Sequence, residues 1–486
     1  MNEFFRVEDF LVGKTFNDFS LNVRGGVVEH RGSVSLATRF SRNIPLNLPI
    51  VAANMDTITG PKMCIAIAQE GGIGILPRSD AIPITLEASW VEEVKRAENF
   101  IIENPYVILE SKSIAEARKE MEKRGVGTLL VTNEKEELVG MITTRRLRLC
   151  LEDNDHIYVW MEKIMNGMMK FSKASINSLD DAIRELKRWD VDKLPLVDKD
   201  FKIKGLVTSK DIANLIRHSW ANKDKKGRLR VGAAIGMTGD YLERADELIK
   251  AGVDVIVMDV AHAHNLKITH GAVESFRRKF GPFELVCGNV ATFEGAEFLG
   301  RLGVDGIKVG IGSGHGCLTR INTGFGVPQL HAIRAVWHAI KDSDLPIISD
   351  GGIKKTGSMT KALAIGASSI MVGSLISATD ETPGELIPDP ETGAEYKTYR
   401  GMTSPEAKLE SVDDPSKIKN VEGKSYRVRP KGSVRKVLSR IRGNLQSAVS
   451  YSGEENLEGL RKKISVDPEA FFIPASLASQ EESNKR

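Results

Sequence analysis

VGAAI at residues 231–235 opens a series of short apolar segments, each of strand length, that continues to residue 372. The further members of this series are VIVM (255–258), ELVC (284–287), GIKV (306–309), PIIS (346–349) and SIMV (369–372). Two earlier segments, PIVAA (49–53) and GIGIL (72–76), have the same character, and helical patterns separate the segments. Eight apolar strands in alternation with helices predict an α/β fold of the (β/α)8 type, a TIM barrel, whose catalytic groups lie at the carboxyl ends of the strands.

An internal repeat interrupts this series. The repeat consists of two similar segments, VTNEKEELVGMI (131–142) and VDKDFKIKGLV (197–207). They are offset by 65 residues, so that Gly140 corresponds to Gly205. A repeated unit of this kind indicates a separate domain. The sequence therefore predicts a barrel in two parts, residues 1–94 and 226–486, with a second domain inserted at residues 95–225.

Each half of the repeat ends in a strand that leads into a hydroxyl-rich turn, TTRR (143–146) and TSKD (208–211). The halves resemble paired cystathionine-β-synthase (CBS) motifs, the tandem module called a Bateman domain. This resemblance implies a regulatory site for an adenine or guanine nucleotide, such as ATP or GTP, with Thr208 and Asp211 as contacts. A module that only packs against a neighbouring subunit is the alternative, and the sequence leaves both open.

The loop GIGSGHGCLTR (310–320) follows the sixth predicted strand and presents one cysteine among four glycines. Glycine lets the backbone approach a ligand closely, so the thiol of Cys317 is expected to be accessible, as a nucleophile must be. Thr319 is expected to face the same reacting centre. The charge of Arg320 is expected to favour the thiolate.

Composition excludes several classes of partner. The 68 basic and 65 acidic residues leave a net charge of +3, which is too balanced to favour nucleic acid or a membrane surface. The longest apolar runs have strand length, and residues 1–10 do not predict a signal peptide. The four cysteines show no paired metal spacing, which is typical of a reducing compartment, so a cytoplasmic location is expected.

Taken together, the motifs resemble the family that contains IMP dehydrogenase and GMP reductase, over nearly the whole chain. Its markers are AANMDT (52–57), the Cys317 loop, TGFGVPQ (323–329), SDGGI (349–353), GS (373–374) and YRGM (399–402). The resemblance implies a purine nucleotide substrate, a nicotinamide cofactor and a potassium ion. It also implies a homotetramer, which the CBS pair can join into an octamer.

The resemblance carries over to single residues as follows. Cys317 adds to C2 of the purine, and Thr319 with Glu422 relays a proton. Backbone amides near strands seven and eight hold the 5'-phosphate, and Asp350 holds the ribose. The substrate-binding set is Met55, His315, Asp350, Gly351, Gly352, Gly373, Ser374, Tyr399, Gly401 and Met402. Asp259 and Asn289 are expected to border the cofactor. The carbonyls of Gly312, Gly314 and Cys317 are expected to bind potassium.

Two features favour the reductase branch, which converts GMP and NADPH to IMP, ammonia and NADP. The dehydrogenase branch activates water with an Arg-Tyr pair on a flap, and between Met402 and Gly432 this chain has only the reversed pair Tyr426-Arg427. The flap, Thr403 to Val421, is also short, as it is in GMP reductases. NAD-dependent IMP dehydrogenase with another base is the first alternative, and a catalytically silent nucleotide-sensing relative is the second. His315 stands where the family usually has a phosphate-binding serine.

Overall fold

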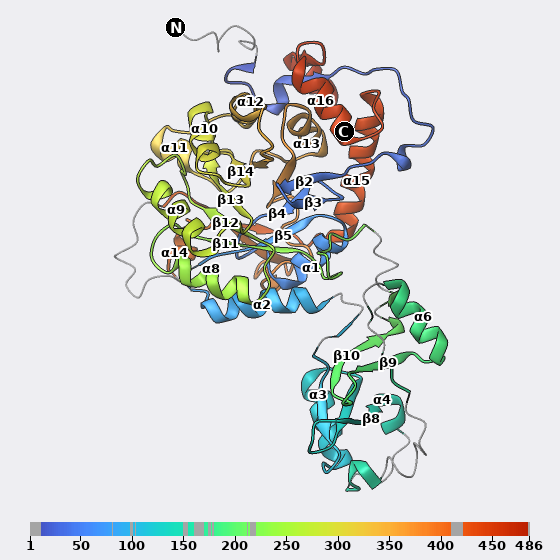
Figure 1. Ribbon diagram of the computed structural model, residues 1–486. Helices are drawn as coiled ribbons and strands as arrows, with labels where there is room; N and C mark the ends of the chain where they lie inside the picture. Colours follow the sequence, from blue (N-terminus) through green and yellow to red (C-terminus); the bar gives the residue numbers. More distant parts are fainter. Residues whose placement is uncertain are drawn as a thin grey trace. The chain divides into compact units, whose positions relative to one another are not determined.

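In the computed structural model the eight apolar segments form one closed parallel barrel, which confirms the predicted fold (Figure 1). Around the ring the strands are β11 (Val231–Ile235), β12 (Val255–Asp259), β13 (Leu285–Val290), β14 (Gly306–Val309), β15 (Ile347–Asp350), β16 (Ser369–Val372), β4 (Ile50–Ala52) and β5 (Ile73–Leu76). Strand β5 pairs with β11 and closes the ring. The structure describes residues 11–79, 81–97, 101–102, 104–148, 154–159, 170–173, 176, 179–210, 212–213, 220–409 and 421–484.

Helices surround the strands, as Figure 1 shows. They are α1 (Pro61–Gln69), α2 (Ile84–Ala97), α8 (Tyr241–Lys250), α9 (Ile268–Phe280), α10 (Phe293–Arg301), α11 (Thr319–Thr323), α12 (Gln329–Ile340), α13 (Thr356–Ala364), α15 (Val434–Tyr451) and α16 (Leu457–Val466). Because strand side chains alternate between faces, Val255 and Val257 pack inside the barrel, whereas Ile256 and Met258 pack in the layer beneath the helices. Both faces are therefore buried, which explains the continuous apolar runs.

A hairpin packs against the interior of the barrel. Strands β2 (Thr38–Ser41) and β3 (Ile44–Leu46) pair antiparallel, and buried Phe40 and Ile44 join the inner cluster of strand side chains. The Arg42 amide bonds the carbonyl of Asp305, just before β14 begins. The hairpin therefore covers the amino ends of the strands, and the opposite end carries the loops in which a site can form.

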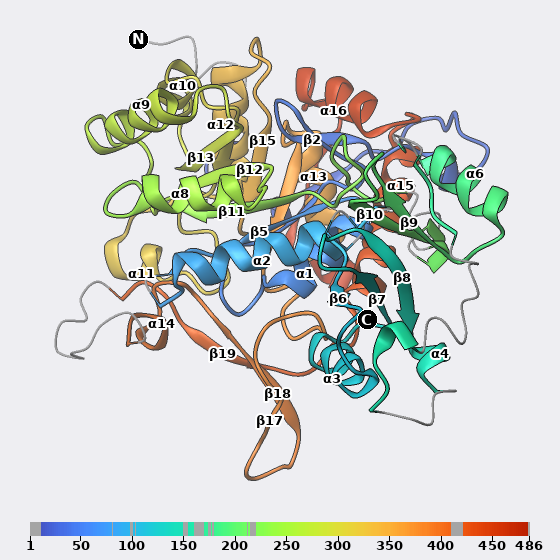
Figure 2. The same ribbon diagram turned by 60° about the horizontal axis from the view of Figure 1, so that its bottom comes forward.

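A small antiparallel sheet follows the last barrel strand. Its strands are β17 (Ile387–Pro388), β18 (Glu395–Arg400) and β19 (Ser425–Val428), with α14 (Pro405–Leu409) between the last two. Figure 2 shows β17 and β18 as a projecting hairpin beside β19. Two shorter pieces pair the chain ends, β1 (Phe19–Leu21) with β20 (Phe472–Pro474). The remaining elements of this unit are η3 (Phe16–Asp18), η4 (Arg31–Ser33) and α17 (Leu477–Asn484).

Contacts divide the chain into two units, residues 1–97 with 220–486 and residues 98–219. The second unit contains β6 (Val107–Leu109), α3 (Ile114–Arg124), β7 (Thr128–Thr132), β8 (Leu138–Thr143), α4 (Thr144–Leu147), α6 (Leu179–Trp189), β9 (Lys193–Val197) and β10 (Ile203–Thr208). Helix α3 and strands β7 and β8 each begin 65 residues before α6, β9 and β10. The sequence repeat is thus a structural repeat.

The two halves of this second unit share a small core, in which Leu130 and Leu138 pack with Val197 and Leu206. Thr208 is buried where β10 ends. Asp211, the other residue predicted to contact a regulatory nucleotide, lies outside the described residues. Among the helices that the structure describes, none has the length and hydropathy needed to cross a membrane.

Candidate functional site

The Cys317 loop leaves the carboxyl end of β14 and crosses the end of β15. Gly310 has φ of +148°, and a Cβ there would lie 2.0 Å from the Asp350 carbonyl oxygen. Only glycine allows so close a crossing. Cys317 is partly exposed, whereas Cys64 and Cys287 are buried, and burial raises the pKa of the Cys287 thiol to about 12. Of these three thiols, Cys317 is the accessible one.

A chain of hydrogen bonds links the Cys317 thiol to a carboxylate. The thiol donates to Thr319 Oγ1 at 3.1 Å, and the Thr319 hydroxyl donates to Glu422 Oε2 at 2.5 Å. Thr319 opens α11, and Glu422 comes from the segment just before β19. The arrangement provides a path for a proton between sulfur and carboxylate.

Backbone bonds hold Glu422 against the loop. The Leu318 amide donates to the Glu422 carbonyl at 2.7 Å, and the Lys424 amide donates to the Gly316 carbonyl at 3.0 Å. Gly401, one of the residues predicted to bind substrate, donates its amide to the Lys424 carbonyl at 3.1 Å. Residues 422–424, just after the flap, are therefore paired with the Cys317 loop by backbone hydrogen bonds.

A buried lysine, for which the sequence analysis made no prediction, joins the ends of three strands. Lys308 Nζ lies 2.9 Å from Asp259 and 2.7 Å from Asp350, and its side chain is 2% exposed. Burial lowers the pKa of Lys308, but the two carboxylates outweigh it and hold the pKa above its ordinary value. Asn54 donates to the other oxygen of Asp259 at 2.5 Å. The sequence signal for this residue is a lysine inside the otherwise apolar strand GIKV (306–309).

Asn289 stands at the border of a cavity of about 670 Å³ beside Cys317. Its amide nitrogen donates to the Gly310 carbonyl at 2.7 Å and to Asp350 at 3.0 Å. Its Oδ1 is buried without a partner in the described structure and can accept a hydrogen bond from a ligand. Of the residues predicted to react or to bind, the cavity lining contains Asn289, Gly312, Gly314, Cys317, Thr319, Asp350, Gly351 and Glu422.

The predicted phosphate and ribose contacts also lie together. A smaller cavity of about 80 Å³ is lined by Met55, His315, Asp350, Gly351, Gly352, Gly373, Ser374 and Tyr399, among others. Met402 lies outside both linings, and its sulfur accepts the Asp56 amide at 3.4 Å. The carboxylate of Asp259 faces Lys308 and Asn54, and Asp259 is in neither lining.

His315 packs against two aromatic rings, Tyr426 and Tyr399. It stacks on Tyr426 with ring centroids 4.9 Å apart, and its centroid lies 6.1 Å from that of Tyr399. Burial, and then the charges of Lys354 and Lys431, lower the pKa of His315 below its ordinary value. The imidazole is therefore neutral near pH 7.

Two further expectations concern charge and metal at the loop. The sequence suggested that the charge of Arg320 favours the thiolate of Cys317. In the structure the Arg320 guanidinium donates a hydrogen bond to the Val327 carbonyl. Within the described residues, no three His, Cys, Asp or Glu side chains gather as metal ligands. Gly312 and Gly314 offer carbonyl oxygens, the donors that a hard monovalent cation takes.

Comparisons with known proteins all point to one family. The model of the IMP dehydrogenase / GMP reductase domain matches residues 13–486. Inosine-5'-monophosphate dehydrogenase of Nitrosopumilus maritimus (strain SCM1) is 40% identical over 484 residues, 98% of either chain. That of Bacillus subtilis (strain 168) is 38% identical over 482 residues, 97% of this chain and 95% of its own. A crystal structure of Trypanosoma brucei GMP reductase with guanosine 5'-monophosphate superposes with a TM-score of 0.88, at 33% identity and 97% coverage of both chains.

Proposed function

Because the chain belongs to the IMP dehydrogenase / GMP reductase family of oxidoreductases, we propose that it is a GMP reductase. The reaction is the reduction of GMP by NADPH, with one proton, to IMP, ammonia and NADP. Family membership already gives a purine nucleotide substrate and a nicotinamide cofactor. The direction and the preferred cofactor are the proposal.

The observation that carries the catalytic chemistry of the proposal is the hydrogen-bonded chain of Cys317, Thr319 and Glu422. Its bonds run from sulfur to hydroxyl to carboxylate, so the thiol proton has a route to Glu422. The thiolate of Cys317 then bonds to C2 of GMP, and the stored proton passes through Thr319 to the departing amino group. Ammonia leaves and a Cys317–C2 bond remains. In the reductase direction, this route would deliver the proton to the departing amine.

The cofactor supplies, when bound, the hydride that C2 receives before Cys317 departs. The 670 Å³ cavity adjoins Cys317 and includes the unpartnered Oδ1 of Asn289, an acceptor for the amide or hydroxyl groups of a nicotinamide nucleoside. These residues fit such a group. The carbonyls of Gly312, Gly314 and Cys317 would hold potassium, which the loop's oxygen donors suit.

The small cavity supports the rest of the substrate assignment. Gly351, Gly352, Gly373 and Ser374 would hold the 5'-phosphate through their backbone amides, and Asp350 would accept from the ribose hydroxyls. Lys308 holds Asp350 in place through an ion pair at 2.7 Å. We assign Met55 and Tyr399 to the walls of the purine nucleotide site.

The reversed pair Tyr426-Arg427 is engaged elsewhere. Tyr426 donates its hydroxyl to the His315 carbonyl at 3.2 Å, and Arg427 forms an ion pair with Asp389 at 3.1 Å. These contacts support the view that the pair does not activate water at Cys317. A chain without that device is suited to release ammonia rather than to hydrolyse an adduct.

IMP dehydrogenase is the second candidate, and the names of the 38–40% identical relatives favour it. In that reaction Thr319 and Glu422 would take a proton from water, and NAD would accept hydride from IMP. The same hydrogen-bonded chain serves either direction.

The experiment compares the two directions by nicotinamide absorbance in potassium buffer. One assay holds GMP with NADPH and the other holds IMP with NAD, and Cys317→Ala is the control. We expect NADPH oxidation that depends on GMP and on Cys317. NADH formation from IMP without GMP-dependent oxidation would establish the dehydrogenase instead, and silence in both would favour a nucleotide-sensing relative.

For the second unit we propose a tandem CBS module that binds ATP or GTP, with Thr208 as a contact. A structure of the Trypanosoma brucei GMP reductase contains guanosine 5'-triphosphate and is 31% identical to this chain, which supports nucleotide binding by such a relative. We also propose a homotetramer that nucleotide joins into an octamer, and a cytoplasmic location.

A further inference from the structure

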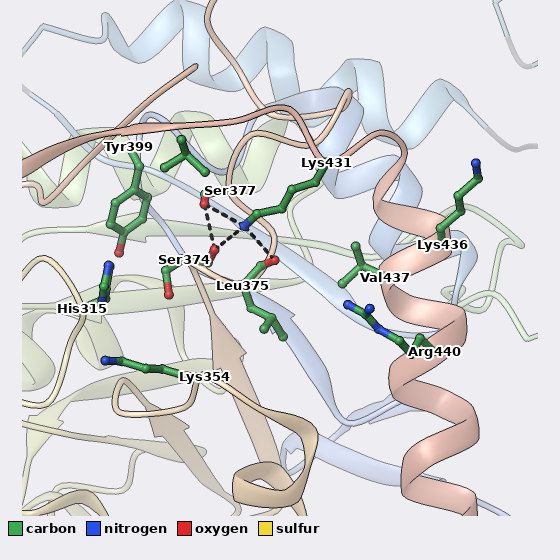
Figure 3. A pocket seen from close by; sticks show the side chains of 11 residues that line it. His315, Lys354, Ser374, Leu375, Ser377, Tyr399, Lys431, Lys436, Val437 and Arg440 are labelled. Carbon is green, nitrogen blue, oxygen red and sulfur yellow. Dashed lines mark hydrogen bonds between the residues drawn. The ribbon is translucent and has the colours of Figure 1, made fainter. Parts of the chain in front are cut away.

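A third cavity adjoins the proposed phosphate site. It has a volume of about 670 Å³ and shares His315, Lys354, Ser374 and Tyr399 with the small cavity, as Figure 3 shows from close by. Beyond this shared rim it extends to Lys431 and to helix α15. A phosphate at Gly373 and Ser374 would therefore stand at the mouth of a larger space.

The lining of this third cavity is basic. It contains Lys354, Lys431, Lys436, Arg440 and His315, and none of its lining residues is acidic. The ammonium group of Lys431 already has partners within the protein, because its Nζ donates to the Ser374 and Leu375 carbonyls and to the Ser377 hydroxyl.

Two of these cations are free to meet an anion. In the described residues neither the Lys354 ammonium nor the Arg440 guanidinium has a hydrogen bond or an ion pair. Figure 3 shows the Arg440 guanidinium directed from α15 toward Leu375, and the Lys354 side chain directed toward His315. Lys436, one turn before Arg440, points away from this space.

We propose that this cavity is a subsite for a second phosphate, so that the barrel binds purine nucleoside 5'-diphosphates such as GDP in competition with GMP. The proposal rests on the proposed function, which puts the first phosphate at Gly373 and Ser374. The second phosphoryl group would extend from the mouth toward Arg440, whose planar guanidinium suits phosphate oxygens. Lys354 would contact the bridge between the two phosphates.

The test uses protection of Cys317 from alkylation by iodoacetamide, read on the Cys317 peptide by mass spectrometry. This readout reports on the barrel site itself and needs no turnover. The wild-type chain is titrated with GMP, with GDP, and with GMP plus inorganic phosphate. We expect GDP to protect at concentrations no higher than GMP, and free phosphate to give no added protection.

Arg440→Gln is the informative variant and Lys436→Gln its matched control, since each removes one positive charge from the same helix. We expect Arg440→Gln to raise the half-protecting concentration of GDP about tenfold, the effect of one lost charge-assisted hydrogen bond, with GMP changed less than about twofold. Lys436→Gln should leave both ligands unchanged within that margin.

Failure of GDP to protect the wild type, or equal weakening of GDP by both variants, would overturn the subsite. Added protection from free phosphate would also overturn it, because the second anion would then bind unattached. If GMP itself gives no protection, the proposed function fails as well, which separates the two failures.

Discussion

Thr319 stands between the Cys317 thiol and the Glu422 carboxylate, with no other side chain in the path that these bonds define. We expect Thr319→Val to lower kcat with GMP by about 100-fold or more, because the proton relay is cut while the side-chain volume is kept. Glu422→Gln should lose a similar factor, because the amide cannot store the proton. Steady-state NADPH oxidation measures both.

Thr319→Ser is the matched control, since it keeps the hydroxyl and removes only a methyl group. It should keep kcat within about tenfold of the wild type. Loss of activity in Thr319→Ser equal to that in Thr319→Val would mean that packing, rather than the hydroxyl, is what the reaction needs.

His315 gives the site a dependence on pH. Its pKa is lowered in the free protein, and a bound phosphate dianion favours the imidazolium, so binding of GMP takes up a proton. The KM for GMP should therefore fall as the pH is lowered from about 7.5 toward the ordinary histidine pKa of about 6.5. Steady-state kinetics across this range checks it.

His315→Ser isolates that effect, because the phosphate of GMP titrates in the same range in both proteins. The variant should retain only the phosphate's own contribution, which weakens binding at lower pH. Parallel KM profiles for the two proteins would contradict a proton taken up at His315.

At the scale of elements, Lys308 ties β14 to the ends of β12 and β15 through Asp259 and Asp350. Lys308→Met should lower the free energy of unfolding by about 3 kcal/mol, because two partly buried carboxylates lose their shared, buried cation. It should also raise the KM for GMP, since Asp350 loses its orientation. Urea unfolding and steady-state kinetics measure the two effects.

The double variant Lys308→Met with Asp259→Asn should recover part of the lost stability, because one of the unpaired carboxylates is gone. An unfolding midpoint of Lys308→Met equal to that of the wild type would show that the ion pairs add nothing.

The barrel strands were predictable because each is a local apolar run and helical patterns separate the runs. The role of Lys308 was not, because its partners come from other strands and meet it only when the barrel closes. The contact that Arg320 makes was not predictable for a related reason. Its charge suggested a partner for the thiolate, but the folded loop directs its guanidinium to the Val327 carbonyl. Tertiary contacts of charged side chains leave little trace in local sequence.

At the scale of the whole molecule, the second unit should couple nucleotide binding to activity or assembly. We expect ATP or GTP to change the rate of NADPH oxidation or the sedimentation coefficient. Thr208→Val should abolish the response, whereas Thr143→Val, at the equivalent place in the first half, serves as the control. Thr143 caps α4 by accepting the Arg146 amide.

No change in either rate or sedimentation with nucleotide would leave the second unit with a structural role only. The repeat itself was legible in the sequence, because α3 and α6 begin 65 residues apart and the strands keep the same offset. The ligand of the repeat does not follow from that symmetry, since the two halves carry different residues in their hydroxyl-rich turns.

The measurement that tests the central claim most directly is the ammonia released per NADPH oxidised, with GMP as the only purine. We expect equal amounts of ammonia, NADP and IMP from the wild-type chain and none of the three from Cys317→Ala. NADPH oxidation without ammonia, or ammonia from Cys317→Ala, would contradict a reductive deamination carried out through Cys317.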